Sequence, residues 1–169
     1  WLASLFYAIL AFNQLYGLEE TNASRQALYL APAPAQGIWL GKALAGLVLL
    51  ALAQIVFLPG MAIFLGQDVK GPAWPGLMAL AVADIGIAAA GSMLGGLAQG
   101  HRAAESLPGI VLFPLLAPLL LAAISLGTAS LEDGRELDSL GWLGVGLAFD
   151  AIFLGLGLML SGLLYQGRP

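Results

Sequence analysis

Long, uninterrupted apolar blocks constrain this sequence more than any other feature. A helix of about 20 apolar residues, rising 1.5 Å per residue, crosses the hydrocarbon core of a bilayer. Several blocks approach or exceed that length, and no charged surface helix separates them. Five candidate spans cover approximately Trp1–Tyr16, Ile38–Gly66, Leu77–Ala98, Ser106–Gly127 and Trp142–Tyr165. The sequence therefore predicts an all-α, polytopic transmembrane helical bundle.

Composition excludes several other classes of protein. Hydrophobic residues make up 60% of the 169 residues, charged residues only 9%, and the mean hydropathy is +0.91. Soluble domains carry about 25% charged residues, so a soluble domain is excluded. The net charge of −4 is spread over the loops and offers no basic surface for nucleic acid. Because the chain has no cysteine, disulfides, thiolate metal sites and cysteine catalysis are excluded as well.

The basic residues predict the orientation of the spans. Lysine and arginine favour cytoplasmic loops. Numbering the sides alternately places four basic residues on one side, which we take as cytoplasmic, and two on the other: Arg25, Lys42, Arg102 and Arg168, against Lys70 and Arg135. The chain opens on Trp1 in mid-apolar sequence, so we interpret residues 1–169 as one integral membrane domain truncated at its N-terminus. The intact protein is then expected to have six spans.

A polar segment, residues 19–34, separates the first two candidate spans and is called the elbow below. Thr21 or Asn22 is expected to cap a short helix that runs to about Ala31. Pro32 and Pro34 would end that helix, because proline donates no backbone hydrogen bond. Two interpretations stay open: an ordinary interfacial loop, or a docking site for a cytosolic partner.

Two acids, Asp84 and Asp150, lie inside predicted spans. A charge at the bilayer centre costs about 2.5–3.5 kcal/mol on insertion scales, so such residues face protein or water and often serve function. The alternative is that each is protonated or hydrogen-bonds a neighbouring helix for packing. His101, the only histidine, lies beside Arg102 in a polar loop, where charge and solvation explain it better than ligation of a cofactor does.

Small residues and prolines mark candidate packing positions. Gly91 and Gly95 lie four residues apart in the third span, and such a face lets two helices approach closely. Pro114 and Pro118 lie four residues apart in the fourth span, where each frees a backbone carbonyl and bends the helix. We expect packing within one protomer at these positions, with a subunit interface as the alternative.

Three stretches carry a resemblance to a known family. The stretch LEETNASRQALYLAPAPAQGIWLGK (18–42) resembles the cytoplasmic segment after the second span of the heme exporter protein B (CcmB) family. The stretch GHRAAESLPGIVLFPLLAPLLLAAISLG (100–127) is similar to that family's basic loop and proline-containing span, and WLGVGLAFDAIFLGLGLMLSGLLY (142–165) is similar to its last span. Their order and spacing match over essentially the whole chain.

The resemblance implies the permease subunit of an ABC-type complex of the bacterial inner membrane, acting in cytochrome c maturation. Its partners would be a cytosolic ATPase (CcmA), the membrane proteins CcmC and CcmD, and the periplasmic heme chaperone CcmE. The chain lacks the glycine-rich phosphate-binding motif, so a partner would bind ATP, and heme would be a transported substrate and not a bound cofactor. Candidate residues for coupling to the ATPase are Glu19, Glu20, Arg25, Leu28, Tyr29 and Pro32.

Two other functions stay open beside the heme exporter. The chain could be an ABC-type permease for a different substrate, such as a drug, a lipid or a polysaccharide. It could instead be a non-transporting membrane scaffold for heme-handling partners. A membrane enzyme is disfavoured, because the sequence shows no clustered acid, histidine and serine constellation.

Overall fold

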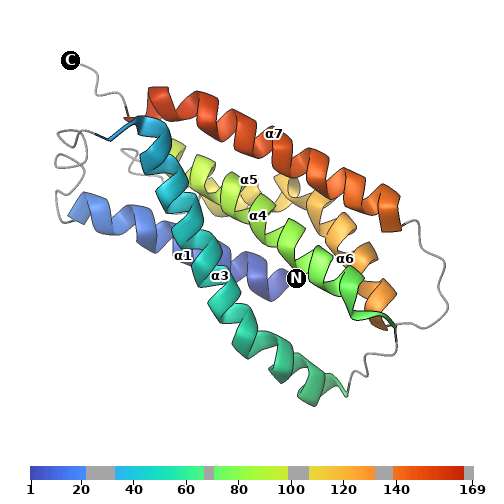
Figure 1. Cartoon of the computed structure of the whole chain (residues 1–169). Coiled ribbons are helices and arrows are strands. Elements are labelled where there is room, and N and C mark those ends of the chain that lie inside the picture. The colour runs from blue at the N-terminus through green and yellow to red at the C-terminus, as the bar shows by residue number, and fades with distance from the viewer. Residues whose placement is uncertain (22–32, 67–70, 99–106, 132–138, 166–169) are drawn as a thin grey trace.

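The structure, a computed structural model, describes residues 1–21, 33–66, 71–98, 107–131 and 139–165. Within these ranges every regular element is a helix (Figure 1). The helices are α1 (Leu2–Thr21), α3 (Ala35–Leu65), α4 (Ala73–Ala98), α5 (Leu107–Leu115), α6 (Ala117–Leu131) and α7 (Ser139–Tyr165). The prediction of an all-α bundle is therefore confirmed.

Three of these helices are long and apolar enough to cross a membrane, judged by length and composition. They are Ala35–Phe64, Ala73–Ala98 and Leu140–Leu163, and two shorter apolar helices cover Leu2–Leu18 and Ala117–Leu131. Figure 1 shows the end of α1, the start of α3 and the end of α7 at one end of the bundle. The starts of α4 and α7 lie toward the other end, so the direction of the chain alternates as expected for successive spans.

Helix boundaries differ from the sequence-based ones where prolines and polar residues suggested a loop. The third span begins at Ala73 and not near Leu77, and Pro75 lies in its first turn. The first backbone N–H groups of a helix have no intrahelical partner, so proline costs little there. The second span begins at Ala35, directly after Pro34, whose φ of −65° and ψ of 140° hold it in extended geometry before the helix.

The fourth predicted span is divided into α5 and α6 at Leu116. Leu116 still donates to the Leu112 carbonyl at 2.9 Å, and its own carbonyl accepts from Leu120 at 2.8 Å. Two hydrogen bonds are lost, because neither Pro114, inside α5, nor Pro118, four residues later, has a backbone N–H to donate. The two prolines therefore account for the division without any large break in backbone pairing.

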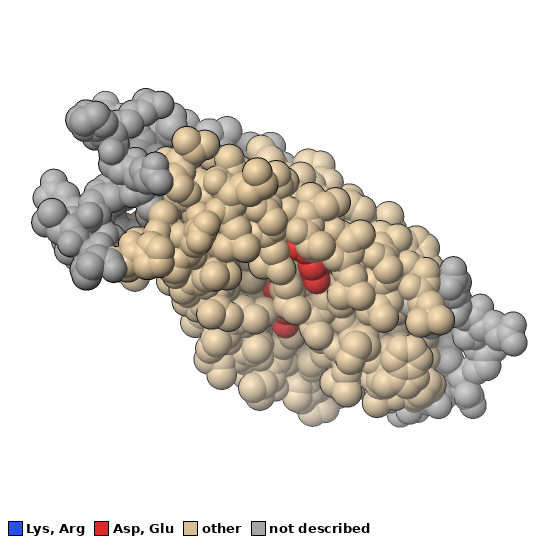
Figure 2. All heavy atoms as spheres, turned by 45° about the horizontal axis from the view of Figure 1, so that its top comes forward, with Lys and Arg blue, Asp and Glu red and all other residues tan. Residues whose placement is uncertain are grey.

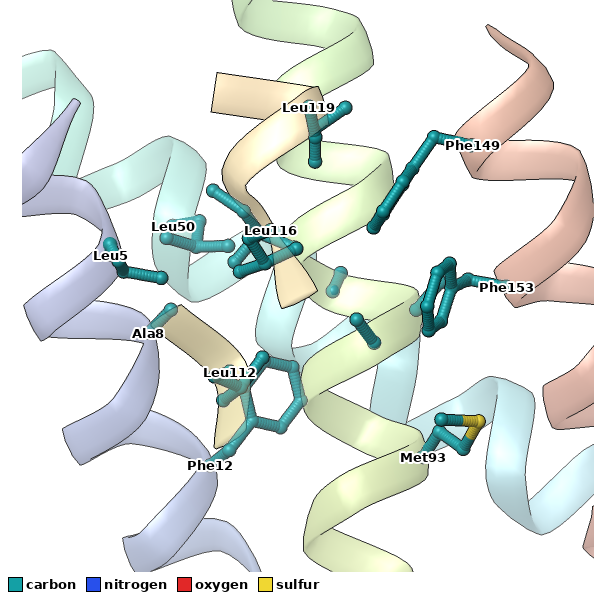
Figure 3. Close-up of a cluster of buried hydrophobic side chains, with 14 of the residues drawn as sticks. Leu5, Ala8, Phe12, Leu50, Met93, Leu112, Leu116, Leu119, Phe149 and Phe153 are labelled. Carbon is teal, nitrogen blue, oxygen red and sulfur yellow. The ribbon is translucent and has the colours of Figure 1, made fainter. Parts of the chain in front are cut away.

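Helix α4 is the central element of the bundle. It packs against α1, α3, α5, α6 and α7, and its sequence is dominated by alanine and glycine. Figure 3 shows large side chains directed toward α4 from its neighbours, including Phe12 on α1 and the pair Phe149 and Phe153 on α7. The two phenylalanine rings stack with centroids 4.4 Å apart. Small residues on the central helix and bulky residues around it make a close-packed interior.

Candidate functional site

Most of the elbow lies outside the described residues, including Arg25, Leu28, Tyr29 and Pro32. Its beginning is described. Helix α1 continues through Glu19 and Glu20 to Thr21, so this helix extends beyond Tyr16, where the sequence placed the end of the first span. The expected short helix, with Asn22 as its other candidate cap, lies outside the described residues.

Next to the elbow, Tyr16 joins three helices. Its hydroxyl donates to the Ser92 carbonyl at 2.7 Å and lies 2.9 Å from the Ser92 hydroxyl, which links α1 to α4. The Lys42 ammonium, on α3, lies 4.2 Å from the centroid of the Tyr16 ring, a cation–π geometry. All three side chains are buried. Nothing in the sequence around Tyr16 marks it as a junction, and Lys42 stands out there only as a basic residue that indicates topology.

Glycines seat the aromatic side chains of α1. A Cβ atom added at Gly91 would lie 2.5 Å from the Phe12 ring, and one at Gly95 would lie 2.6 Å from the Tyr16 ring. Gly46, on α3, closes on the other side of Phe12. Only glycine leaves room for these rings, so a larger residue at position 91 or 95 would force α1 and α4 apart.

Trp39 fills a similar position between α3 and α7. It is fully buried, and a Cβ atom at Gly157 would collide with its ring. Its indole Nε1 finds no hydrogen-bond acceptor among the described residues. Trp39 lies one turn before Lys42 on α3, so the elbow end of this helix contacts α7 as well as α1.

Three buried polar side chains lie at one depth in the bundle. Asp84 and Asp150 are each eleven residues after the first residue of α4 and α7, and Gln54 is eleven residues before the last residue of α3. These helix termini lie toward the same end of the bundle (Figure 1). Eleven residues correspond to about 16 Å of helix, which is about half of a 30 Å hydrocarbon core. In a bilayer that begins at these helix termini, the three residues would lie near the middle of the hydrocarbon core.

The two acids face different neighbours and do not form a pair. Gln54 Nε2 donates to Asp84 Oδ1 at 2.6 Å, which joins α3 to α4. Asp150 instead packs beside Gly86, where an added Cβ atom would lie 2.5 Å from its Oδ1. Positions 84 and 86 are separated by about 200° around α4. Figure 2 shows acidic atoms as small separate patches midway along the molecule, surrounded by uncharged residues.

The two carboxyl groups also differ in how they are satisfied. Asp84 accepts the Gln54 bond, whereas neither oxygen of Asp150 has a hydrogen-bond partner within the described residues. Both side chains are buried, with exposed fractions of 6% and 4%. Of the two sequence-based interpretations, the helix-linking one fits the geometry of Asp84. Among the described carboxyl groups, Asp150 is the buried one that packing alone does not explain.

The described residues offer no constellation for metal binding. No group of three or more histidine, cysteine, aspartate or glutamate side chains occurs among them. His101, which the sequence placed in a polar loop, lies outside these residues. What the described part of the chain offers is helix-to-helix contact: the Tyr16 junction, the Gln54–Asp84 bond and the glycine seats.

Long apolar helices, small residues at their contacts and polar groups turned inward define a multi-pass helical membrane protein. The model of the CcmB protein family matches residues 1–159, and the chain belongs to that family. This confirms the resemblance drawn from three stretches of the sequence. The family consists of permease subunits of the cytochrome c maturation system, so the chain is a permease subunit and not an enzyme. No curated protein and no solved structure matches the chain.

Proposed function

We propose that this chain is the permease subunit of an ABC-type heme exporter, coupling a separate cytosolic ATPase to heme export or to heme release onto a periplasmic chaperone. The observation that carries the proposal is the family match over residues 1–159, because family membership implies the heme-exporter role. The partners follow from the same source: a CcmA-like ATPase, CcmC-like and CcmD-like membrane proteins, and a CcmE-like chaperone. The location is the inner membrane of a bacterium.

The arrangement of the helices supports coupling at the elbow end. The elbow leaves α1 at Thr21 and joins α3 at Ala35, so a partner bound there acts on two helices at once. The basic residues Arg25 and Arg102 lie in the connections expected at this end, on the side that the positive-inside rule makes cytoplasmic. A cytosolic ATPase would therefore meet the chain where the Tyr16 junction lies one to two turns inside the bundle.

The surface supports residence in a lipid bilayer. Large apolar side chains of α3 are exposed along most of the helix, among them Ile55, Ile63 and Phe64. Lys42, Asp84 and Asp150 are the charged residues whose side chains the structure describes, and all are buried. A hydrocarbon solvent requires this distribution, because apolar side chains cost nothing there and charges cost several kcal/mol.

Complementation of a deletion strain tests the proposal. A strain lacking the full-length gene should lose heme-stained c-type cytochromes and heme-loaded chaperone, and the gene supplied on a plasmid should restore both. Haem-free apocytochrome should still be made and translocated. If c-type cytochromes mature normally in the deletion strain, the permease serves a different substrate. If they are lost but the chaperone is still loaded with heme, the chain acts after heme release.

A further inference from the structure

We propose that Tyr16 is a positioning residue, whose hydroxyl joins α1 to α4 and whose ring contacts Lys42 on α3, so that a displacement of the elbow moves the central helix. This inference rests on the proposed coupling to a cytosolic ATPase. It assigns a transmitting role to a side chain that lies inside the bundle and contacts neither nucleotide nor partner.

Tyr16 contacts two helices besides its own. Its hydroxyl reaches both oxygens of Ser92, the carbonyl at 2.7 Å and the hydroxyl at 2.9 Å. Its ring lies under the Lys42 ammonium at 4.2 Å. One side chain therefore contacts a polar group of α4 and a cationic group of α3. In a buried, low-dielectric setting, both interactions are stronger than they would be in water.

Tyr16 and Lys42 both lie close to the elbow along the chain. Tyr16 lies five residues before the last residue of α1, and Lys42 lies seven residues after the first residue of α3. At 1.5 Å per residue these positions are about 8 Å and 10 Å into the bundle. The two helices that leave the elbow thus meet at one side chain, nearer the elbow than the contact of Gln54 on α3 with Asp84 on α4.

Two glycines of α4 leave room for two aromatic rings of α1. Phe12 and Tyr16 lie one helical turn apart on α1, and their rings fit against Gly91 and Gly95, one turn apart on α4. Two aromatic rings in two glycine seats resist sliding of α1 along α4, while the hydrogen bonds to Ser92 resist separation. Rigid-body movement of the two helices together is then the easier response to a push.

The consequence lies in the position of α4. This helix packs against all the other described helices, and it carries Asp84 eight residues before Ser92. A displacement that reaches α4 therefore reaches the buried polar groups and the α7 side of the bundle.

Distance measurement between two spin labels tests the link itself. The chain has no cysteine, so labels at Leu18→Cys on α1 and Leu97→Cys on α4 are unambiguous, and both positions are exposed. The full-length permease in lipid nanodiscs should give one narrow distance distribution. Tyr16→Phe, which keeps the ring and removes the hydroxyl, should broaden or shift it. Ser92→Ala should have a smaller effect, because the Ser92 carbonyl still accepts a hydrogen bond.

Tyr7→Phe is the matched control. Tyr7 lies on the same helix, its ring meets Phe57 edge-on at 6.4 Å between centroids, and no hydrogen bond of its hydroxyl is found within the described residues. This substitution makes the same chemical change as Tyr16→Phe and should leave the distance distribution unaltered. A broadened distribution in both variants would mean that loss of any tyrosine hydroxyl loosens α1, which overturns the assignment to Tyr16.

Coupling is measured in the complex with its ATPase. Tyr16→Phe should keep ATP hydrolysis and membrane levels near those of the parent, while heme delivered per ATP falls about fivefold, the effect of one hydrogen bond. A merely structural role would lower protein level and both rates together. Unchanged distances overturn the link, and changed distances with unchanged heme per ATP overturn the transmission. If the parent complex shows no ATP-dependent heme delivery, the proposed function and the transmission both fail, whereas the distances still decide the link.

Discussion

Gln54 and Asp84, thirty residues apart in the sequence, are joined by a 2.6 Å hydrogen bond between α3 and α4. Both side chains are buried, so each depends on the other for its polar contact. The bond fixes the point at which α3 passes the central helix. It also makes a specific energetic prediction.

Replacing either member of this pair should destabilise the protein, and replacing both should cost less than the sum. Gln54→Leu or Asp84→Leu leaves one buried group unpaired, at a cost of about 1–3 kcal/mol. A double-mutant cycle, measured by thermal unfolding in nanodiscs, should give a coupling energy of about 0.6 kcal/mol, within the range for membrane hydrogen bonds. Asp84→Leu combined with Ser161→Ala should be additive, because the Ser161 hydroxyl bonds within its own helix. If the losses of stability for the Gln54 and Asp84 variants simply add, the two side chains do not interact, and this hydrogen bond does not join α3 to α4.

Asp150→Asn should raise thermal stability and lower activity. Both carboxyl oxygens lack a partner within the described residues, so removing the charge relieves a burial cost while keeping the shape. A polar group retained without structural benefit points to a role in the working cycle. The measurements are the unfolding midpoint of the purified protein and heme staining of c-type cytochromes in cells. Full activity in a more stable Asp150→Asn protein would show that the carboxyl group has no role in the working cycle.

Alanine at Gly91 or Gly95 should destabilise the protein by about 1–3 kcal/mol, the usual cost of overpacking. An added Cβ atom would lie 2.5 Å from the Phe12 ring at Gly91 and 2.6 Å from the Tyr16 ring at Gly95. The Phe12 ring also has a glycine, Gly46, on its other side. Gly155→Ala is the matched control, because it lies within α7 with nothing within 4 Å of an added Cβ atom. The thermal unfolding midpoint of that control should equal or slightly exceed the midpoint of the parent. Equal effects at all three glycines would mean that helix propensity dominates, and not the ring contacts.

Orientation in the membrane can be tested with single cysteines and an impermeant thiol reagent. Cysteines at Ser24 and Gly100 should be shielded when the reagent is added outside intact cells, because the Lys/Arg distribution places both on the cytoplasmic side. A cysteine at Leu140, exposed near the start of α7, should be labelled. Permeabilised cells provide the control for reactivity. The inverse pattern would place the elbow outside, away from any cytosolic ATPase.

The sequence predicts the spans because membrane solvent imposes a length and a composition that a linear pattern records directly. The apolar runs lead to α1, α3, α4 and α7, and Pro114 with Pro118 marks the place where the fourth run divides. The glycine spacing on α4 is equally visible. The side chains that fill those glycine seats cannot be predicted in the same way. Phe12 belongs to α1, where apolar residues occur on all sides of the helix and mark no preferred face.

The Tyr16 junction illustrates what a single sequence withholds. Tyr16 and Ser92 are 76 residues apart, and nothing local to either residue predicts that they meet. Lys42, just inside an apolar run, has the position of a side chain that extends toward the interface, yet it is 7% exposed. Thr21 is the last residue of α1, and local preference does not distinguish a residue that ends one helix from a residue that caps the next.

The elbow provides the most direct test of the central claim, that this permease works with a cytosolic ATPase in cytochrome c maturation. Leu28→Asp and Tyr29→Asp should each abolish co-purification of the ATPase and heme staining of c-type cytochromes while the protein still inserts. Glu19→Gln should change both little, because a charge at a helix end contributes a few tenths of a kcal/mol to about 1 kcal/mol. If both aspartate variants retain the ATPase and the cytochromes as the parent does, the elbow is an ordinary loop and the proposed coupling is wrong.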